Sequence, residues 1–349
     1  MIRLGIIGCG GMAAAQAERF DEVKGCKVVA CSDIVPGRAE AFAKKFRIPA
    51  VHEDTAKMLA AEELDGVSVV TIDSAHEEPV LQAIKRGLHV MCEKPLSTTL
   101  ASAKKMAAAA KRGKLITAVN FSYRNSAATQ KAADLVASGK LGRIMHVEGA
   151  YMQSWLPSKV WGDWHTMECW LWRLSTKHGS AGVMGDVGVH LYDLASFVVG
   201  DINEIHCNMK TFKKDKKRIG PYVFDANDSA MASVRFANGA IGTLNMTRWA
   251  TGHANTVALR VYGDKGSLDL NLDRPAPETL RACLGKDVDK CAWKNLRCPQ
   301  VPDMYQRFIT AIRTGKQGQT SFAGGTKVQA YLDASFRSAA KQGWVKVKV

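Results

Sequence analysis

A short apolar strand that runs directly into a glycine turn near the amino terminus limits the fold of this chain more than any other feature. Residues 3–13 read RLGIIGCGGMA, with glycine at positions 8 and 10 and alanine at position 13. Gly8 permits a tight turn, Gly10 lets a phosphate approach the backbone, and the small Ala13 lets the next helix pack close to the strand. The segment therefore predicts a dinucleotide-binding βαβ unit.

An acid at the end of the next expected strand bears on which dinucleotide binds. Residues 27–32 form that strand and Asp33 follows it, about 20 residues beyond the turn. Its carboxylate can accept hydrogen bonds from an adenosine ribose diol, so we predict NAD rather than the 2′-phosphorylated NADP. The nearby Arg38 keeps NADP as the less favoured alternative.

The same residues also resemble a secretory signal, including a lipoprotein-like segment around Cys9. The apolar run before Cys9 is shorter than the ~7–15 residues that a signal peptide needs, and it already belongs to the strand. The nine cysteines form no C-x-x-C pair, which fits reduced thiols. We therefore expect a cytoplasmic protein, and no segment is apolar and long enough to span a membrane.

Charge does not point to a nucleic-acid partner. The 349 residues carry a formal charge of +15, yet the basic residues are spread along the chain apart from the run KKDKKR at 213–218. We interpret that run as a solvated hairpin or loop. The surplus charge favours anionic cofactors or substrates in a general way.

The order of expected elements predicts two domains. Strands at 27–32, 66–71, 89–92 and 115–120 alternate with helices at 11–23, 37–46, 55–61, 77–86 and 100–112, as in a doubly wound parallel sheet. After a helix at 126–138, alternating strands follow at 144–152, 204–211, 228–236, 240–249, 256–262 and 266–270, with Asn238-Gly239 as a hairpin turn. We predict a Rossmann domain over 1–122 and an α+β domain over 123–349, with helices on one face of an antiparallel sheet.

Two further segments carry groups suited to catalysis. Glu93-Lys94-Pro95 follows a parallel strand at its carboxyl end, where ligands of such sheets bind, although a lone lysine there would be read as a solvated charge. The segment GSAGVMGDVGVHLYD over 179–193 opens a helix on which Asp186 and His190 share a face and Asp193 follows one turn later. A buried, hydrogen-bonded histidine is the plainer alternative. No cysteine and histidine spacing supports zinc, so we predict no metal ion.

Together these motifs resemble the Gfo/Idh/MocA (glucose–fructose oxidoreductase / inositol dehydrogenase) family. The resemblance rests on the glycine turn, Glu93-Lys94-Pro95, Tyr123-Arg124, Trp172-Arg173 and Asp186-x-x-x-His190-x-x-Asp193, and it reaches residues 308–315 and 334–338 near the end. It implies a Rossmann domain, a second domain with a large open sheet that forms homodimers or homotetramers, and oxidoreduction at the hydroxyls of sugars or cyclitols. The chain departs from the family at Thr71-Ile72, where Thr-Pro is frequent, and at Gly179-Ser180-Ala181-Gly182, where three glycines are usual.

By matching position, the resemblance implies that Lys94 and His190 are catalytic and that Asp186 helps to hold the substrate. A neutral imidazole can take the hydroxyl proton, and an ammonium can stabilise the developing alkoxide while the nicotinamide accepts hydride. The cofactor contacts expected from the turn, the strand ends and the resemblance are Gly8, Gly10, Gly11, Met12, Asp33, Arg38, Thr71, Ile72, His76, Glu93, Lys94 and Arg124.

A cluster of tryptophans precedes the Asp186 segment. Trp155, Trp161, Trp164, Trp170 and Trp172 fall within eighteen residues. Their rings suit the C–H faces of a pyranose, although we expect about half of them to be packing residues. The substrate contacts that we predict are Lys94, Tyr123, Trp161, Trp164, His165, Trp172, Arg173, Asp186 and His190.

Three functions remain open at this point. The leading one is an NAD-dependent dehydrogenase acting on a secondary hydroxyl of a sugar, glycoside or cyclitol. The second is a glycosidase or lyase that uses bound NAD transiently, and the third is a non-catalytic NAD-sensing regulator. Net accumulation of NADH separates the first two, and the presence of both Lys94 and His190 argues against the third.

Overall fold

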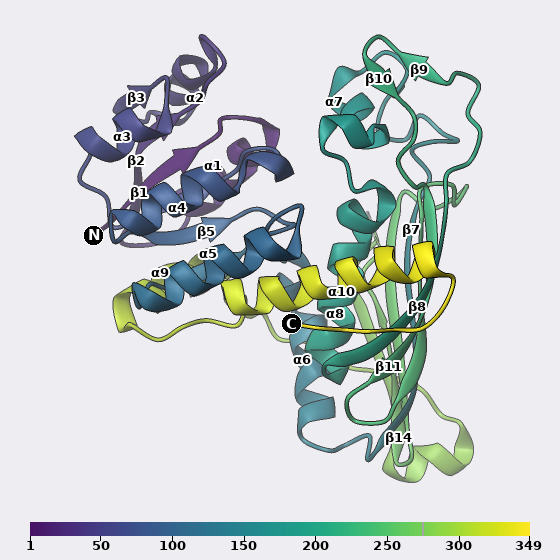
Figure 1. The fold of residues 1–349 in the computed structure, drawn as a ribbon. Helices are drawn as coiled ribbons and strands as arrows, with labels where there is room; N and C mark the ends of the chain where they lie inside the picture. The colour runs from purple at the N-terminus through teal and green to yellow at the C-terminus, as the bar shows by residue number, and fades with distance from the viewer. Residues whose placement is uncertain (274–275) are drawn as a thin grey trace. The chain divides into compact units, whose positions relative to one another are not determined.

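The computed structural model describes residues 1–273 and 276–349, and it divides into two compact units (Figure 1). The first unit comprises Met1–Ser122 and Pro302–Gln329, and the second comprises Tyr123–Val301 and Ala330–Val349. We expected residues 302–329 in the second domain, but the structure places them in the first unit. The reason is that α9 (Met304–Thr314) adds its apolar face to that unit's core. Within the described ranges, no helix is both long and apolar enough to cross a bilayer.

The described strands of the first unit form a parallel sheet in the order β3-β2-β1-β4-β5-β6, which confirms the doubly wound prediction. The strands are β1 (Ile2–Ile7), β2 (Cys26–Ser32), β3 (Ala50–His52), β4 (Gly66–Val69), β5 (His89–Cys92) and β6 (Thr117–Val119). The helices between them are α1 (Gly11–Asp21), α2 (Arg38–Phe46), α3 (Thr55–Ala61), α4 (Glu77–Lys85) and α5 (Leu100–Arg112). The sequence did not predict β3, because three residues are too few to show an alternating pattern.

Alternate residues of β1 face opposite sides of this sheet. Leu4 lies in a buried cluster with Phe20 of α1 and Phe308 of α9. On the other side, a Cβ added at Gly5 would lie 3.0 Å from the side chain of Met58 in α3. Helices therefore cover both faces, as a parallel sheet requires.

The second unit is built on a large mixed sheet, which confirms the open, mainly antiparallel sheet that we predicted. In the described part of the chain its order is β16-β15-β14-β13-β7-β12-β11-β8-β17, and only β7 and β12 pair in parallel. The strands are β7 (Ile144–Gln153), β8 (Ile202–Lys210), β11 (Ser229–Phe236), β12 (Ile241–Thr247), β13 (Asn255–Gly263), β14 (Gly266–Asn271), β15 (Thr279–Leu284), β16 (Lys294–Asn295) and β17 (Val345–Lys346). The predicted hairpin turn joins β11 to β12, with Gly239 at a φ of 91°.

One side of this sheet carries α6 (Ala127–Ala137), α8 (Val189–Val199) and the second half of α10 (Phe322–Lys341) (Figure 1). The residues of β11 alternate between buried and more exposed positions, as expected for a strand with one covered face. The helix α8 packs directly on β7 and β13 and against α6. The sheet therefore holds α8, with Asp193 and His190, from one side.

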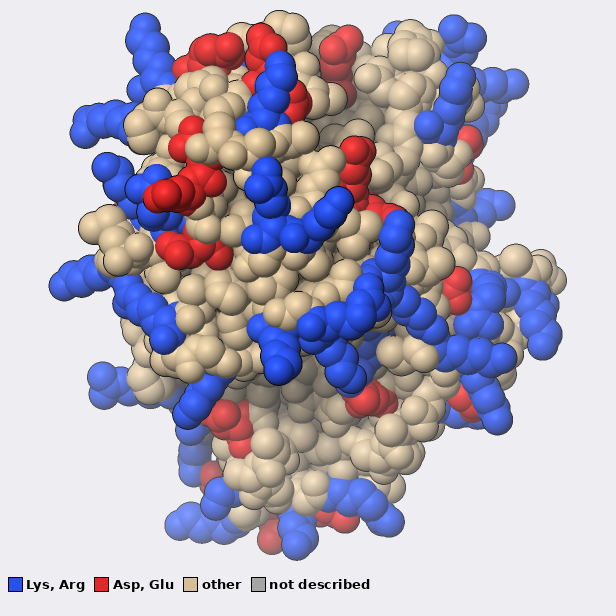
Figure 2. Space-filling view, turned by 60° about the vertical axis from the view of Figure 1, so that its left-hand side comes forward, with Lys and Arg blue, Asp and Glu red and all other residues tan. Residues whose placement is uncertain are grey.

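The basic segment at 213–218 differs from our prediction. It leads into a small hairpin of β9 (Arg218–Ile219) and β10 (Tyr222–Val223), but the Lys214 side chain is only 1% exposed. Its Nζ lies 2.7 Å from Oδ2 of the fully buried Asp228, and this opposite charge compensates for the lost hydration. Elsewhere the basic side chains are dispersed, and Figure 2 shows them projecting over the whole visible face with acidic residues among them.

Candidate functional site

The glycine turn between β1 and α1 is shaped to admit a ligand. Gly8 has a φ of 88°, and a Cβ there would lie 2.8 Å from the carbonyl oxygen of Val70, so only glycine fits. Around Gly10 and Gly11 an added Cβ would meet nothing within 4 Å, and Met12 is exposed. The space beside the start of α1 is therefore open, as the approach of a pyrophosphate to the backbone requires.

The acid at the end of β2 is held by this turn. Oδ2 of Asp33 accepts a hydrogen bond from the Cys9 amide at 2.8 Å, and Oδ1 accepts one from the Val35 amide at 2.8 Å. Nη1 of the half-exposed Arg38 lies 3.5 Å from Oδ2. Each carboxylate oxygen has two lone pairs, so Asp33 retains acceptor capacity for a ribose diol.

The carboxylate of Glu93 is engaged in hydrogen bonds with other side chains of the first unit. Its Oε1 accepts hydrogen bonds from Nε2 of Gln16 at 2.6 Å and from Nδ2 of Asn120, and Ser68 donates to Gln16 in turn. Glu93 is 7% exposed, so we assign it to fixing the segment rather than to direct contact with a ligand. Lys94, the next residue, is only partly buried.

His76 also lies beneath the surface instead of on it. It is fully buried, with Nδ1 3.0 Å from the Pro95 carbonyl oxygen and Nε2 3.2 Å from that of Thr71. The imidazole thus joins the segment after β4 to the segment after β5, and in the neutral state it can donate to only one of them. Ile72 is 56% exposed and is the predicted residue of this segment that is open to a ligand.

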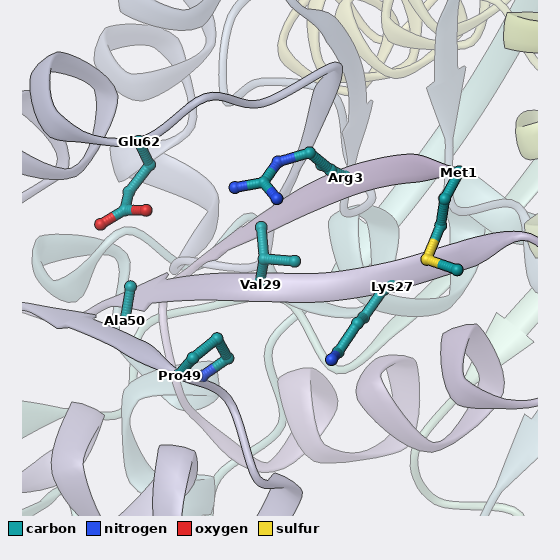
Figure 3. A pocket seen from close by; sticks show the side chains of 7 residues that line it. All are labelled: Met1, Arg3, Lys27, Val29, Pro49, Ala50 and Glu62. Atoms are coloured by element: carbon teal, nitrogen blue, oxygen red, sulfur yellow. The ribbon is translucent and has the colours of Figure 1, made fainter.

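The first unit also has a hollow of about 470 Å³ at the opposite end of its strands (Figure 3). Its lining includes Met1 and Arg3 at the start of β1, Lys27 at the start of β2, and Glu62. Because the glycine turn follows the carboxyl end of β1, this hollow is separate from the predicted cofactor contacts.

In the second unit, His190 follows a local irregularity of its helix. Met184–Gly188 form a π-helical turn, and α8 continues from Val189. The wider turn displaces Asp186 from the regular spacing that we predicted, and such turns are frequent at functional sites. The His190 residue is 8% exposed, and its ring lies edge-on to Tyr123 with 5.2 Å between centroids.

Two arginines hold Asp186. Nη2 of Arg248 lies 3.0 Å and Nε of Arg173 lies 3.8 Å from its Oδ2, while Arg248 also donates to the Arg173 carbonyl at 3.1 Å. Burial lowers the pKa of Arg248, and the charge of Asp186 opposes that effect. Sequence reasoning missed Arg248, and the available signal was a lone charge at the end of an alternating strand.

The resemblance places Arg124 near the cofactor, but here its guanidinium faces Asp193 within the second unit. Nε and Nη2 lie 2.9 Å and 2.6 Å from the two carboxylate oxygens, and the cation also lies 4.3 Å from the ring centroid of Phe197. Burial raises the pKa of Asp193, and the adjacent Arg124 acts against this. The pair ties the start of α6 to α8 and so fixes the backbone that carries His190.

The tryptophan segment separates into buried and accessible rings. Trp155 and Trp164 are 1% and 4% exposed and belong to an apolar cluster, with Nε1 of Trp164 donating to the Leu156 carbonyl. Trp161 packs against this cluster and stacks on Trp170. We therefore assign Trp164, one of our predicted substrate contacts, to packing. Trp172 lies outside the cluster and is half-buried.

The two polar residues predicted with these rings have different surroundings. His165 stacks on Trp164 at 3.7 Å, and its nitrogens contact Asp163 at 2.8 Å and Asp215 at 3.1 Å, so it ties the basic segment to the tryptophan segment. The charge of Arg173 lies 4.6 Å from the ring centroid of Trp172. Among residues 1–273 and 276–349, no three histidine, cysteine, aspartate or glutamate side chains gather as a metal site would need.

The parallel sheet with its glycine turn and the mixed sheet that carries His190 define a two-domain oxidoreductase of the dinucleotide-binding class. The chain belongs to the Gfo/Idh/MocA oxidoreductase family, because residues 2–121 match its NAD-binding Rossmann-fold domain and residues 129–269 match its C-terminal domain. The family resemblance and the prediction of an NAD-binding oxidoreductase are thereby confirmed.

Characterised relatives carry sugar specificities. The chain is 26% identical to levoglucosan dehydrogenase of Pseudarthrobacter phenanthrenivorans, over 89% of this chain and 87% of that protein. It is 30% identical to D-glucoside 3-dehydrogenase of Escherichia coli, over 69% and 68%. A solved structure of levoglucosan dehydrogenase in complex with NADH and levoglucosan aligns with a TM-score of 0.88 and 25% identity, over 100% of this chain and 99% of that one.

Proposed function

We propose that this protein oxidises a secondary hydroxyl of a sugar, glycoside or cyclitol with NAD, and that Lys94 and His190 are its catalytic pair. The observation that carries the proposal is the arrangement around His190, which is set on a fixed helix after a carboxylate held by two arginines. The specificities of the relatives, levoglucosan and D-glucosides, support a carbohydrate as the substrate.

The chemistry divides among these side chains. The imidazole of His190 takes the hydroxyl proton, because an imidazole can accept and release a proton near physiological pH. The ammonium of Lys94 donates a hydrogen bond to the same oxygen and stabilises the negative charge that develops there. Asp186 accepts a hydrogen bond from a neighbouring hydroxyl, and Arg173 and Arg248 hold the carboxylate in place.

The first unit fits NAD at its glycine turn. The amides at Gly10 and Gly11 would hold the pyrophosphate, and the carboxylate of Asp33 would accept hydrogen bonds from the adenosine ribose. When bound, NAD supplies the hydride acceptor. Thr71, Ile72 and Lys94 are the residues that we propose beside the nicotinamide.

The substrate's ring would rest on Trp172, the predicted substrate contact that lies outside the buried cluster, and Trp172 would thus serve as a platform for the sugar. Arg173, which lies against that ring and beside Asp186, would bind hydroxyl or carboxylate groups. Among the other predicted contacts, Tyr123 is buried, and Trp161 packs against the apolar cluster and stacks on Trp170.

We also propose that two or four copies associate through the sheet face away from the helices. Ala150 and Ala258 pair there across β7 and β13, and Thr243 and Ser233 continue the same face on β12 and β11. The small side chains at these positions let a second copy approach the strands, and the exposed Met231 and Ile241 on β11 and β12 add apolar surface to the same face. Ala150→Arg should reduce the mass in sedimentation equilibrium, whereas Ala108→Arg, on an exposed position of α5, should not.

The cytoplasm is the proposed compartment, because it keeps thiols reduced and the nine cysteines, all within the described residues, are free thiols. Fractionation of cells that produce the full chain tests this proposal. Recovery of the protein with a periplasmic or membrane fraction would contradict it.

A substrate screen tests the proposed reaction. NAD reduction is followed by absorbance against a panel of sugars, glycosides and cyclitols, with Lys94→Ala and His190→Ala as matched variants. We expect NADH to accumulate with at least one substrate, and each variant to lower turnover by about 10²-fold or more at nearly unchanged NAD affinity. Product formation without net NADH would favour the transient-redox alternative, and full activity of either variant would remove that residue from the mechanism.

A further inference from the structure

The imidazole of His190 lies against two tyrosine rings that approach it from different elements. Its centroid is 5.2 Å from that of Tyr123, with an interplanar angle of 88°, and 6.3 Å from that of Tyr151, at 47°. The two tyrosine rings are themselves edge-to-face at 5.7 Å and 89°. Tyr123 precedes α6 and Tyr151 lies in β7, so their rings bound the imidazole from two directions.

A closed ring of hydrogen bonds fixes these two tyrosines. The Tyr123 hydroxyl donates to the Tyr151 oxygen at 2.8 Å, the Tyr151 hydroxyl donates to Oδ1 of Asn255 at 2.9 Å, and Nδ2 of Asn255 donates back to the Tyr123 oxygen at 3.0 Å. Each member donates once and accepts once within the ring, so the three bonds polarise one another in the same sense. Gln153 adds a second donor to Oδ1 of Asn255 at 2.8 Å.

The surroundings of this hydrogen-bonded cycle keep it intact. Tyr123 and Tyr151 are 6% and 5% exposed. Burial raises the pKa of Tyr151 well above its usual value, so its hydroxyl keeps the proton that it donates. Asn255 and Gln153 are register partners at the ends of β13 and β7, so the sheet itself sets the distance between the amides and the tyrosines.

We propose that Tyr123, Tyr151 and Asn255 form a positioning device that fixes the plane of the His190 imidazole. The device holds two aromatic rings at set angles, and a flat imidazole packed against both cannot rotate freely about its Cβ–Cγ bond. A base must hold its nitrogen toward the proton that it takes, and a small misplacement lowers the rate strongly. This proposal rests on the proposed role of His190, and it moves Tyr123 from a substrate contact to a positioning residue.

Removal of one hydroxyl tests the device. Tyr151→Phe keeps the aromatic ring but opens the hydrogen-bonded cycle at two bonds. The matched control is Tyr192→Phe, because Tyr192 is a fully buried tyrosine on the same helix as His190 whose hydroxyl bonds to Ser335 at 2.7 Å instead. Asn255→Asp is a second variant, which keeps the acceptor of the cycle and loses its amide donor.

Two measurements on these variants test the proposal, namely the nuclear magnetic resonance of His190 and the turnover rate. In the free enzyme, the carbon-bound proton resonances of His190 should shift or broaden in Tyr151→Phe and in Asn255→Asp, and they should stay in place in Tyr192→Phe. In turnover, the first two variants should lower kcat by about tenfold, with NAD affinity and melting temperature no lower than in the control.

The outcomes are distinct for the device and for the proposed function. Unchanged His190 resonances in Tyr151→Phe, or a kcat equal to that of the control, would overturn the device. Shifted resonances in a protein that oxidises no sugar would leave the device standing and would overturn the proposed function. If one of the two variants, Tyr151→Phe or Asn255→Asp, does not fold, the other still tests the device.

Discussion

Replacing Trp164 by alanine should destabilise the second unit without changing the KM for the substrate. The ring is 4% exposed, stacks on His165 at 3.7 Å and meets Phe224 edge-on at 5.5 Å. Emptying a buried aromatic site costs about 3–5 kcal/mol. The lost hydrogen bond to the Leu156 carbonyl places the expected value toward the upper end of that range.

The matched change is Trp172→Ala, because Trp172 is half-buried and lies outside the apolar cluster. Its free-energy cost should be about 1 kcal/mol, which is typical of single substitutions. If the ring supports the sugar, the change should raise KM for the substrate and leave NAD affinity unchanged. The same Trp164 variant should show nearly unchanged KM in the protein that remains folded.

Thermal unfolding and steady-state kinetics on the two variants decide the question. At about 2–4 °C per kcal/mol for a unit of this size, Trp164→Ala should lower Tm by about 6–20 °C. A Trp164→Ala protein with the Tm of the wild type and a strongly raised KM would refute the assignment by burial. A Trp172→Ala protein with unchanged KM would remove the platform.

Three further predictions follow from buried or fixed charges. NAD should bind more tightly than NADP in calorimetry, because a 2′-phosphate would meet the carboxylate of Asp33, and Asp33→Asn should narrow the difference; a clear preference for NADP would contradict this. Lys214→Met leaves the charge of Asp228 buried without its partner and should cost about 3–5 kcal/mol in urea unfolding, so a loss near zero would contradict the pairing. Burial raises the pKa of Asp193 above its usual value of 3.8, so the folded state binds this proton more tightly than the unfolded chain. The free energy of unfolding should therefore fall as pH rises from about 3.8 through the pKa of the folded state. Asp193→Asn should remove this part of the pH dependence, and an unchanged profile would contradict it.

The sequence by itself determined the features that depend on neighbouring residues. Gly8 with its positive φ, the strand before it and the helix after it define the cofactor turn within eleven residues. The hairpin at Asn238-Gly239 and the change from alternating helices and strands to successive strands are equally local. These patterns sufficed for the parallel sheet, the mixed sheet and the family.

The tertiary structure alone decided which polar groups meet. Arg248 reaches Asp186 across 62 residues, Arg124 reaches Asp193 across 69, and Asn255 reaches Tyr123 across 132. No periodicity links positions so far apart, because register in the sheet and the packing of α8 bring them together. For the same reason residues 302–329 joined the first unit: an amphipathic helix shows which face is apolar, but not which core will bury it.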